Sequence, residues 1–227
     1  MQDRTSEWFV PKIGSRNFRI GVGMLFLPYT SIVTCFVVWG SISGPFVLDR
    51  LVAICIMYFL AVGVSAHCFD AVCGKTKPWG TLPKKKILII GIFSLGIVFA
   101  IGTYYAFLDS PLLIPIGIVE GFFLFAYNME LFGGRFHNNL STVISWGILP
   151  VFAGSAIQTN SISVETLLLS TVSSFVTYFL IITSRKYKEL KRNEPNSSKI
   201  KNKEKILKLI TILVITGTSL FFVLRII

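Results

Sequence analysis

Seven apolar segments dominate the chain, and each is close to the roughly 20 residues that an α-helix needs to cross a lipid bilayer. They cover residues 18–40, 48–69, 87–108, 111–132, 140–157, 163–184 and 205–225. Because lipid offers the backbone no hydrogen-bonding partner, each segment should be a helix that satisfies its own N–H and C=O groups. The sequence therefore predicts an all-α fold: a polytopic transmembrane helical bundle of about seven spans, forming a single membrane domain over residues 1–227.

Prolines and cysteines refine this expectation. Pro28, Pro115 and Pro150 lie inside three of the spans, where they predict kinks or local unwinding packed against neighbouring helices. The four cysteines are scattered over apolar spans and one span end, which suits neither a disulfide framework nor a metal knuckle. We expect them to be reduced.

The distribution of basic residues predicts the orientation. When the connecting segments are assigned alternately to two sides, twenty Lys and Arg residues fall on one side and only Arg50 and Arg225 on the other. Positively charged loops stay in the cytoplasm, so an integral protein of the cell membrane is expected with segment 1–17 in the cytoplasm, a cytoplasmic basic linker at 185–204 and the C-terminus outside. The net charge of +11 then reflects attraction to anionic membrane lipids, and no nucleic-acid partner is expected.

Polar residues with catalytic potential gather at two span ends on the predicted cytoplasmic side. The first, "AHCFDAVCGKTKPWG", places His67 and Asp70 one helical turn apart and is followed by Lys75 and Lys77. The second, "AYNMELFGGRFHNN", surrounds a Gly-Gly break and carries Asn128, Glu130, Arg135, His137 and Asn138. The loops on the other face are short and offer few polar groups, so a site should open toward the cytoplasm or the inner leaflet.

Carboxylates beside clustered Lys and Arg at helix ends are what diphosphate chemistry requires. Carboxylate oxygens hold Mg²⁺, the metal bridges phosphate oxygens, and the basic side chains neutralise charge on the leaving group. An apolar bundle would hold the hydrocarbon tail. The alternative is that Asp70 and Glu130 are interfacial residues that pair with nearby cations and have no catalytic role.

These residues resemble the motifs of the UbiA-type intramembrane prenyltransferases. The family's first motif is Asn-Asp-x-x-Asp-x-x-x-Asp at the end of the second span, where this chain has Ala66, His67, Asp70 and Gly74. Its second motif, Asp-x-x-Gly-Asp-Arg, is matched by Glu130, Gly133, Gly134 and Arg135. The chain is also similar to a divergent subgroup with degenerate aspartate motifs, through "AHCFD", "KPWGT" and "NMELFGGRFHNN".

The resemblance implies a helical bundle that binds Mg²⁺ and an isoprenyl diphosphate and transfers the prenyl chain to a lipophilic acceptor. It places Asp70 and Glu130 on the metal, and Lys75, Lys77 and Arg135 on phosphate. Members usually have nine spans and more aspartates, and one carboxylate from each loop suffices for a single Mg²⁺ completed by diphosphate oxygens and waters. Asn128, His137 and Asn138 are further candidates for substrate binding.

Two alternatives concern the histidines and a carboxyl in the middle of a span. His67 could act as a base, a diphosphate donor or a metal ligand, and His67, Asp70, Glu130 and His137 together could form a transition-metal site. Glu120 lies mid-span, where a carboxyl should be protonated or face a polar cavity that Tyr127, on the same helix face, could also line. There it could exchange protons with a carbocation or an acceptor hydroxyl.

Function is accordingly predicted as membrane-embedded prenyl transfer with Mg²⁺-assisted departure of diphosphate. The catalytic candidates are Asp70, Glu130, His67 and Glu120. The alternatives are a terpene cyclase of the same family type and a non-catalytic protein that binds or transports an isoprenoid lipid. An inverted-repeat transporter is disfavoured by the odd number of spans.

Overall fold

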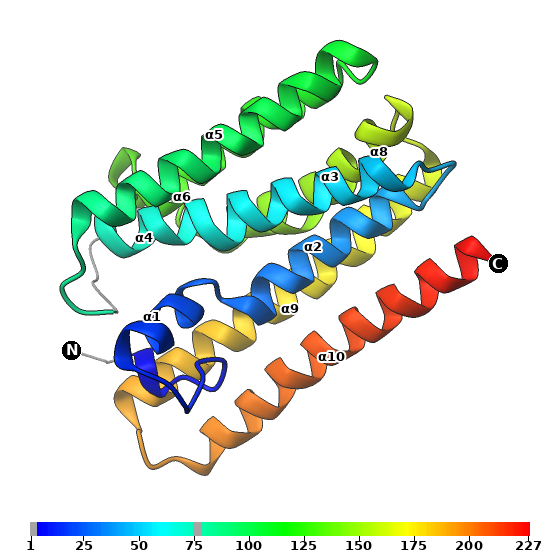
Figure 1. Ribbon diagram of the computed structural model, residues 1–227. Helices are drawn as coiled ribbons and strands as arrows, with labels where there is room; N and C mark the ends of the chain where they lie inside the picture. Colours follow the sequence, from blue (N-terminus) through cyan, green and yellow to red (C-terminus); the bar gives the residue numbers. More distant parts are fainter. Residues whose placement is uncertain (1–3, 75–78) are drawn as a thin grey trace.

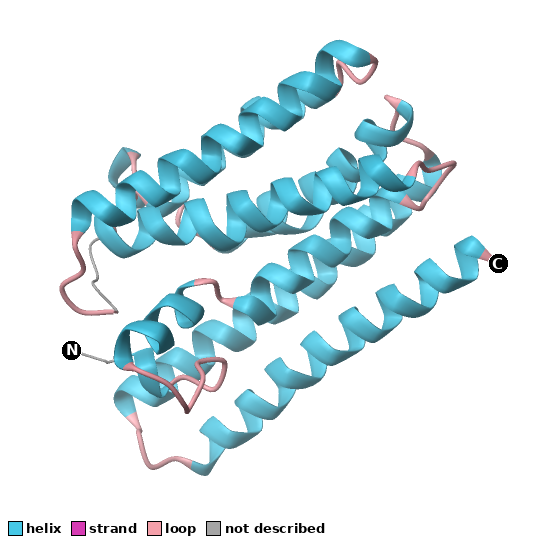
Figure 2. Ribbon diagram, viewed as in Figure 1, coloured by secondary structure: helices cyan, strands magenta, loops and turns pink. Residues whose placement is uncertain are grey.

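The computed structural model describes residues 4–74 and 79–227, and within these residues all regular structure is helical (Figures 1 and 2). Figure 1 shows long helices running side by side, with the two chain ends at opposite ends of the bundle. The main helices are α1 (Arg16–Met24), α2 (Leu27–Ser41), α3 (Leu48–Tyr58), α4 (His67–Cys73), α5 (Lys84–Leu108), α6 (Leu113–Asn128), α7 (Asn139–Val143), α8 (Leu149–Thr159), α9 (Val164–Asn193) and α10 (Ser198–Ile226). Short 3₁₀ turns η1 (Arg4–Ser6) and η3 (Phe132–Gly134) and π-helical segments η2 (Phe59–Ala66) and η4 (Ile144–Ile148) complete them.

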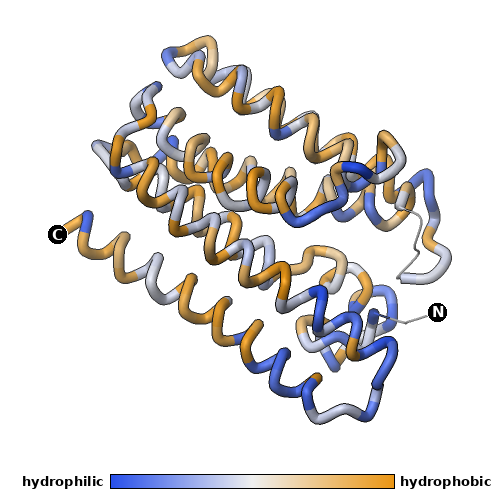
Figure 3. The backbone as a smooth tube through the Cα atoms, turned by 180° about the vertical axis from the view of Figure 1, so that it is seen from behind, coloured by the Kyte–Doolittle hydropathy of each residue, from blue (hydrophilic) through white to orange (hydrophobic). Residues whose placement is uncertain are grey.

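All seven predicted spans are helical. Among the described residues, six continuous helical stretches are long and apolar enough to cross a membrane: Arg16–Ser41, Leu48–Cys73, Lys84–Leu108, Asn139–Thr159, Val164–Asn193 and Ser198–Ile226. The seventh, α6, is apolar but only 16 residues long. The protein is therefore a multi-pass integral membrane protein, and Figure 3 shows its hydrophilic stretches gathered mainly at the end of the bundle that contains the N-terminus.

Two of the three span prolines coincide with departures from regular α-helix. The chain breaks at Phe26, whose φ of 44° is left-handed, and Pro28 then occupies the first turn of α2. Pro150 follows directly on the π-helical segment η4, at the start of α8. Pro115 instead lies in the first turn of α6, where its missing N–H would have had no intrahelical partner, so it causes no interior kink.

The closest helix contact in the bundle is between α2 and α8. A Cβ added to Gly40 would overlap the carbonyl oxygen of Val151, and one added to Gly154 would overlap the carbonyl oxygen of Val37. Ser41 Oγ adds a hydrogen bond of 3.2 Å to the carbonyl oxygen of Gly154. Small residues let the two backbones touch, which is the usual basis of helix association in lipid.

The remaining helices pack around this pair. Helix α5 is joined to η2 by two hydrogen bonds, from Ser65 Oγ to the carbonyl oxygen of Gly91 at 3.0 Å and from Ser94 Oγ to that of Leu60 at 3.1 Å. At the end of the bundle remote from the N-terminus, Arg50 forms an ion pair of 2.6 Å with Asp109 and also donates to the carbonyl oxygen of Ile157. These contacts close that end with protein hydrogen bonds.

The basic segment 185–204 forms no separate surface helix. Helix α9 continues through its first part to Asn193, and α10 begins at Ser198, so only a short connection separates the two. The positive charges therefore lie on the ends of α9 and α10, and the same two helices continue across the apolar layer.

Replacing Gly40 by Ala tests the contact between α2 and α8. The new methyl group has no room beside the Val151 carbonyl, so we expect the free energy of unfolding to fall by about 1–3 kcal/mol or more. Gly217→Ala is the matched control, because nothing lies within 4 Å of a Cβ at that position of α10. Thermal unfolding of both variants in the same detergent measures the difference, and equal midpoints would contradict the close approach.

Candidate functional site

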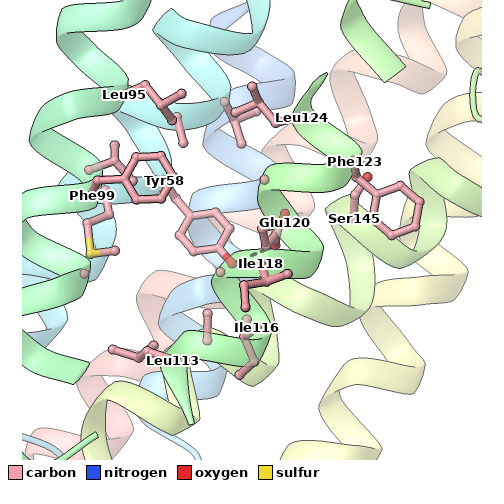
Figure 4. A pocket seen from close by; sticks show the side chains of 18 of the residues that line it. Tyr58, Leu95, Phe99, Leu113, Ile116, Ile118, Glu120, Phe123, Leu124 and Ser145 are labelled. Atoms are coloured by element: carbon pink, nitrogen blue, oxygen red, sulfur yellow. Dashed lines mark hydrogen bonds between the residues drawn. The ribbon is translucent and has the colours of Figure 1, made fainter. Parts of the chain in front are cut away.

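An elongated apolar pocket lies between α3 with η2, α5, α6, and η4 with α8 (Figure 4). Its volume is about 380 Å³, within the range of roughly 300–1,000 Å³ for small-molecule sites. Leu113 and Asn128 both line it and occupy the two ends of α6, so the pocket extends over roughly 22 Å along that helix. Phe99 and Ile118 line it and are exposed, which places an opening between α5 and α6 toward the surface that would face lipid.

The first acidic residue sits at one end of this pocket. Ala66, at the end of the π-helical segment, lines the pocket, and Asp70 follows four residues later on α4. Residues four apart share one face of a helix, so Asp70, which does not itself line the pocket, lies about one turn beyond Ala66 on that face. Asp70 is half-buried, and its neighbour Phe69 packs on Phe125 of α6 with ring centroids 5.6 Å apart. The charges of Glu130 and His137, from the second predicted loop, act on the Asp70 carboxyl. The ends of the two spans that precede the acidic loops thus lie side by side.

The second loop is built from a run of left-handed residues. Glu130, Phe132, Gly133 and Gly134 have φ values of 50°, 55°, 69° and 80°. Hydrogen bonds from the N–H of Leu131 to the carbonyl of Ala126, and from that of Gly134 to the carbonyl of Glu130, fold the chain back directly after α6. Gly supplies this conformation at no steric cost, which accounts for the Gly-Gly pair. Glu130 is only two residues after Asn128, which lines the pocket end, and the turn keeps the chain close to that end.

Tyr127 and His137 pack against each other beside this end. Their rings are stacked with centroids 4.2 Å apart, and His137 Nδ1 lies 3.4 Å from the carbonyl oxygen of Tyr127. Tyr127 and Asn128 both line the pocket, whereas His137 and Arg135 are exposed in the loop. Asn128 Nδ2 donates to the carbonyl oxygen of Leu124 at 2.7 Å, which fixes its amide group at the pocket wall.

Two predicted residues have structural roles. Asn138 caps α7: its Oδ1 accepts from the N–H of Ser141 at 2.9 Å, and its Nδ2 donates to the carbonyl of Arg135 at 2.7 Å. His67 is buried and stacked on Phe26, with ring centroids 4.5 Å apart and nearly parallel. Its Nδ1 lies 3.4 Å from the carbonyl oxygen of Gly63 in the π-helical segment. Lys75 and Lys77 lie outside the described residues.

The alternative of a four-residue transition-metal site is contradicted in the described part of the chain. No group of three or more His, Cys, Asp or Glu side chains among residues 4–74 and 79–227 is arranged to hold a metal ion. Asp70 and Glu130 remain a suitable pair for Mg²⁺, because that ion takes hard oxygen ligands and usually only one or two protein carboxylates. Their convergence at the pocket end fits a metal whose other ligands are diphosphate oxygens and waters.

Two cations near Asp70 were not identified from the sequence. Arg4, in the N-terminal 3₁₀ turn, lies over Phe26 with its guanidinium carbon 5.3 Å from the ring centroid. Burial lowers the pKa of Arg4 from its ordinary value, while the nearby carboxylates of Asp70 and Glu7 raise it. Lys188 on α9 is exposed and interacts electrostatically with Asp70 and Arg4. The acidic end of the pocket therefore carries positive charge from two distant parts of the chain.

The N-terminal segment is held in place by specific contacts. The carboxylate of Glu7, a buried residue, accepts from the Tyr187 hydroxyl at 2.9 Å and pairs with Lys191 at 3.0 Å. Arg19 donates to the carbonyl oxygens of Pro11 and Thr5, both at 2.8 Å. The sequence offered no signal for Lys188, which is one of many lysines in its segment. The packing of this segment on α9 through Glu7 was likewise not predicted from the sequence.

Comparison with known protein families decides the assignment. Residues 27–227, from the start of α2 to the end of the chain, match the UbiA prenyltransferase family. The chain belongs to the UbiA prenyltransferase family. No curated protein and no solved structure matches it. The UbiA match includes both Asp70 and Glu130, and members of this family are generally prenyltransferases that act on isoprenyl diphosphates and typically depend on Mg²⁺.

A pair of variants separates a capping role of Asn138 from substrate binding. Asn138→Ala removes the acceptor for the Ser141 N–H and should lower the free energy of unfolding by about 1 kcal/mol, whereas Asn138→Ser keeps a cap and should be close to wild type. Thermal unfolding and prenyl-diphosphate turnover are measured on both. Loss of turnover in the well-folded Ser variant would contradict the purely structural role.

Proposed function

We propose that this UbiA family member is a prenyltransferase that transfers the chain of an isoprenyl diphosphate to a lipophilic acceptor. The observation that carries the proposal is the packing of α4, which carries Asp70, on α6, which Glu130 follows, beside one end of a mainly apolar pocket. A diphosphate with a hydrocarbon tail has the same division into a charged end and an apolar end. The site is proposed to open to the cytoplasmic leaflet.

Each part of the site has a defined task. Asp70 and Glu130 would hold Mg²⁺, which when bound neutralises diphosphate oxygens and favours their departure. The charges of Arg4 and Lys188 act on Asp70, and they would stabilise negative charge as it develops on the leaving group. The apolar walls orient the prenyl chain and exclude water, which protects an electrophilic carbon from hydrolysis. Arg135 and the lysines at 75 and 77 are proposed as further phosphate contacts.

Replacing either carboxylate tests the metal-binding role. Asp70→Asn and Glu130→Gln remove a hard anionic ligand without changing side-chain volume, so turnover should fall by roughly 100-fold or more. Released diphosphate is measured with geranylgeranyl diphosphate and membrane lipid extract in nanodiscs, with and without Mg²⁺. Asp49→Asn, which changes an exposed aspartate in the first turn of α3, is the matched control. Unchanged Mg²⁺-dependent release in both variants would remove the two carboxylates from the site.

Lys188 is tested against its neighbour on the same helix. Lys188→Gln should raise KM for the diphosphate substrate roughly tenfold, because a charge-assisted contact to phosphate is lost. Lys186→Gln is the control, since Lys186 is exposed and pairs with Glu189 at 3.2 Å. Equal KM values for the two variants would show that Lys188 does not contact the substrate.

Cyclisation of the prenyl chain is the second candidate. It is favoured by one observation: the Glu120 carboxyl lines the pocket beside the space proposed for the chain, where it could transfer a proton to or from a carbocation. Product analysis after Mg²⁺-dependent diphosphate release distinguishes a cyclic hydrocarbon from a prenylated acceptor. Binding of the lipid without release would instead indicate a non-catalytic carrier.

A further inference from the structure

Glu120 and Tyr58 form an isolated polar pair halfway along the apolar pocket. The Tyr58 hydroxyl donates a hydrogen bond of 2.8 Å to Glu120 Oε1, from α3 to α6 across the pocket (Figure 4). Both side chains line the pocket, and most of the surrounding lining is aliphatic or aromatic. A carboxyl in such surroundings is costly to desolvate, and one hydrogen bond satisfies only part of its capacity.

The pair leaves one donor and one acceptor for a ligand. The Tyr58 proton is committed to Glu120 Oε1, so the lone pairs of the Tyr58 oxygen remain as acceptors. Apolar surroundings favour the neutral carboxyl, so the second oxygen of Glu120 carries a proton and donates. A ligand that satisfies both must accept one hydrogen bond and donate another. A neutral donor enters an apolar pocket at a lower desolvation cost than a cation, which favours a hydroxyl over an ammonium group.

The position of the pair suits an acceptor molecule. Glu120 lies eight residues before Asn128 on α6, which corresponds to roughly 12 Å along the helix. Helical side chains lean toward the N-terminus of their helix, so the carboxyl points away from the Asp70 end. A ligand whose hydroxyl is held at Glu120 would therefore direct its opposite side toward the end where the diphosphate carbon is proposed to lie.

We propose that Glu120 and Tyr58 are the binding subsite for a neutral hydroxyl group, alcoholic or phenolic, on the lipophilic acceptor. The assignment to the acceptor rests on the proposed prenyl transfer. The subsite fixes the orientation of the acceptor and selects hydroxylated lipids over hydrocarbons and ethers of the same shape, because a hydrocarbon pairs with neither group and an ether leaves the Tyr58 oxygen without a donor.

The test compares two probes that differ in one donor. Binding of para-octylphenol and para-octylanisole to the full-length protein in nanodiscs is measured by equilibrium dialysis, with empty nanodiscs correcting for partition into lipid. Wild type should prefer the phenol roughly tenfold after that correction. Either single substitution would leave hydrogen-bonding groups of the other residue free for the phenol. The double variant Tyr58→Phe/Glu120→Leu removes every donor and acceptor of the pair and should lose the preference.

Controls make the outcome decisive. Tyr178→Phe, on the exposed surface of α9, and Glu189→Gln, outside the pocket, should keep the phenol preference of wild type. The subsite would be overturned by a wild type that binds both probes equally, or by a Tyr58→Phe/Glu120→Leu variant that keeps the preference. The diphosphate-release assay is run on the same preparations, so loss of phenol selectivity with intact release refutes this inference alone, and absence of release with intact selectivity refutes only the proposed transfer.

Discussion

The contact of α2 with α8 is the constraint on which the rest of the bundle depends. In lipid there is no hydrophobic force to drive helices together, so association relies on close van der Waals packing and interhelical hydrogen bonds. Gly40 and Gly154 let each backbone reach a carbonyl oxygen of the other helix, and Ser41 adds a hydrogen bond. Both helices also pack against α3, and α8 packs against α6. The pocket walls are therefore fixed relative to this pair, whereas α5, which covers the pocket from outside, is largely exposed.

The charged end of the pocket depends on a second, weaker set of contacts. Arg4 reaches Asp70 only because the N-terminal segment is tied to α9 through Glu7, Tyr187 and Lys191. Buried ion pairs contribute little net stability, since desolvation offsets most of the attraction. Their benefit here is positional: they hold a guanidinium beside Phe26 and against the helix that carries His67 and Asp70. The buried ring of Trp79 from the "KPWGT" stretch packs edge-on against the same Phe26 and closely approaches Gly23.

The sequence predicted the elements of this fold well and their arrangement only in part. Hydropathy identified all seven helices because an apolar stretch in lipid must form a helix to satisfy its backbone hydrogen bonds. It also marked the span ends that carry Asp70 and Glu130. Their convergence required tertiary structure, since α5 and α6 separate them in the chain. Lys188 was hidden among the lysines of a basic run, and Pro115 was expected to kink α6 although it lies in the first turn. The four-residue metal site failed because burial of His67 under Phe26 removes one of its ligands.

The placement of the two kinds of acidic group along α6 separates their tasks. Glu130 follows the C-terminal end of the helix, and its charge acts on Asp70. Glu120 lies inside the apolar layer with Tyr58 as its hydrogen-bond donor. Because roughly 12 Å of helix lies between Glu120 and Asn128, where α6 ends, a single small group cannot bridge both carboxyl groups. A ligand that uses both must be extended and must change from charged to apolar to polar along its length, or two ligands must meet between them. Prenyl transfer, which joins a diphosphate-bearing chain to a second lipophilic molecule, satisfies the latter condition directly.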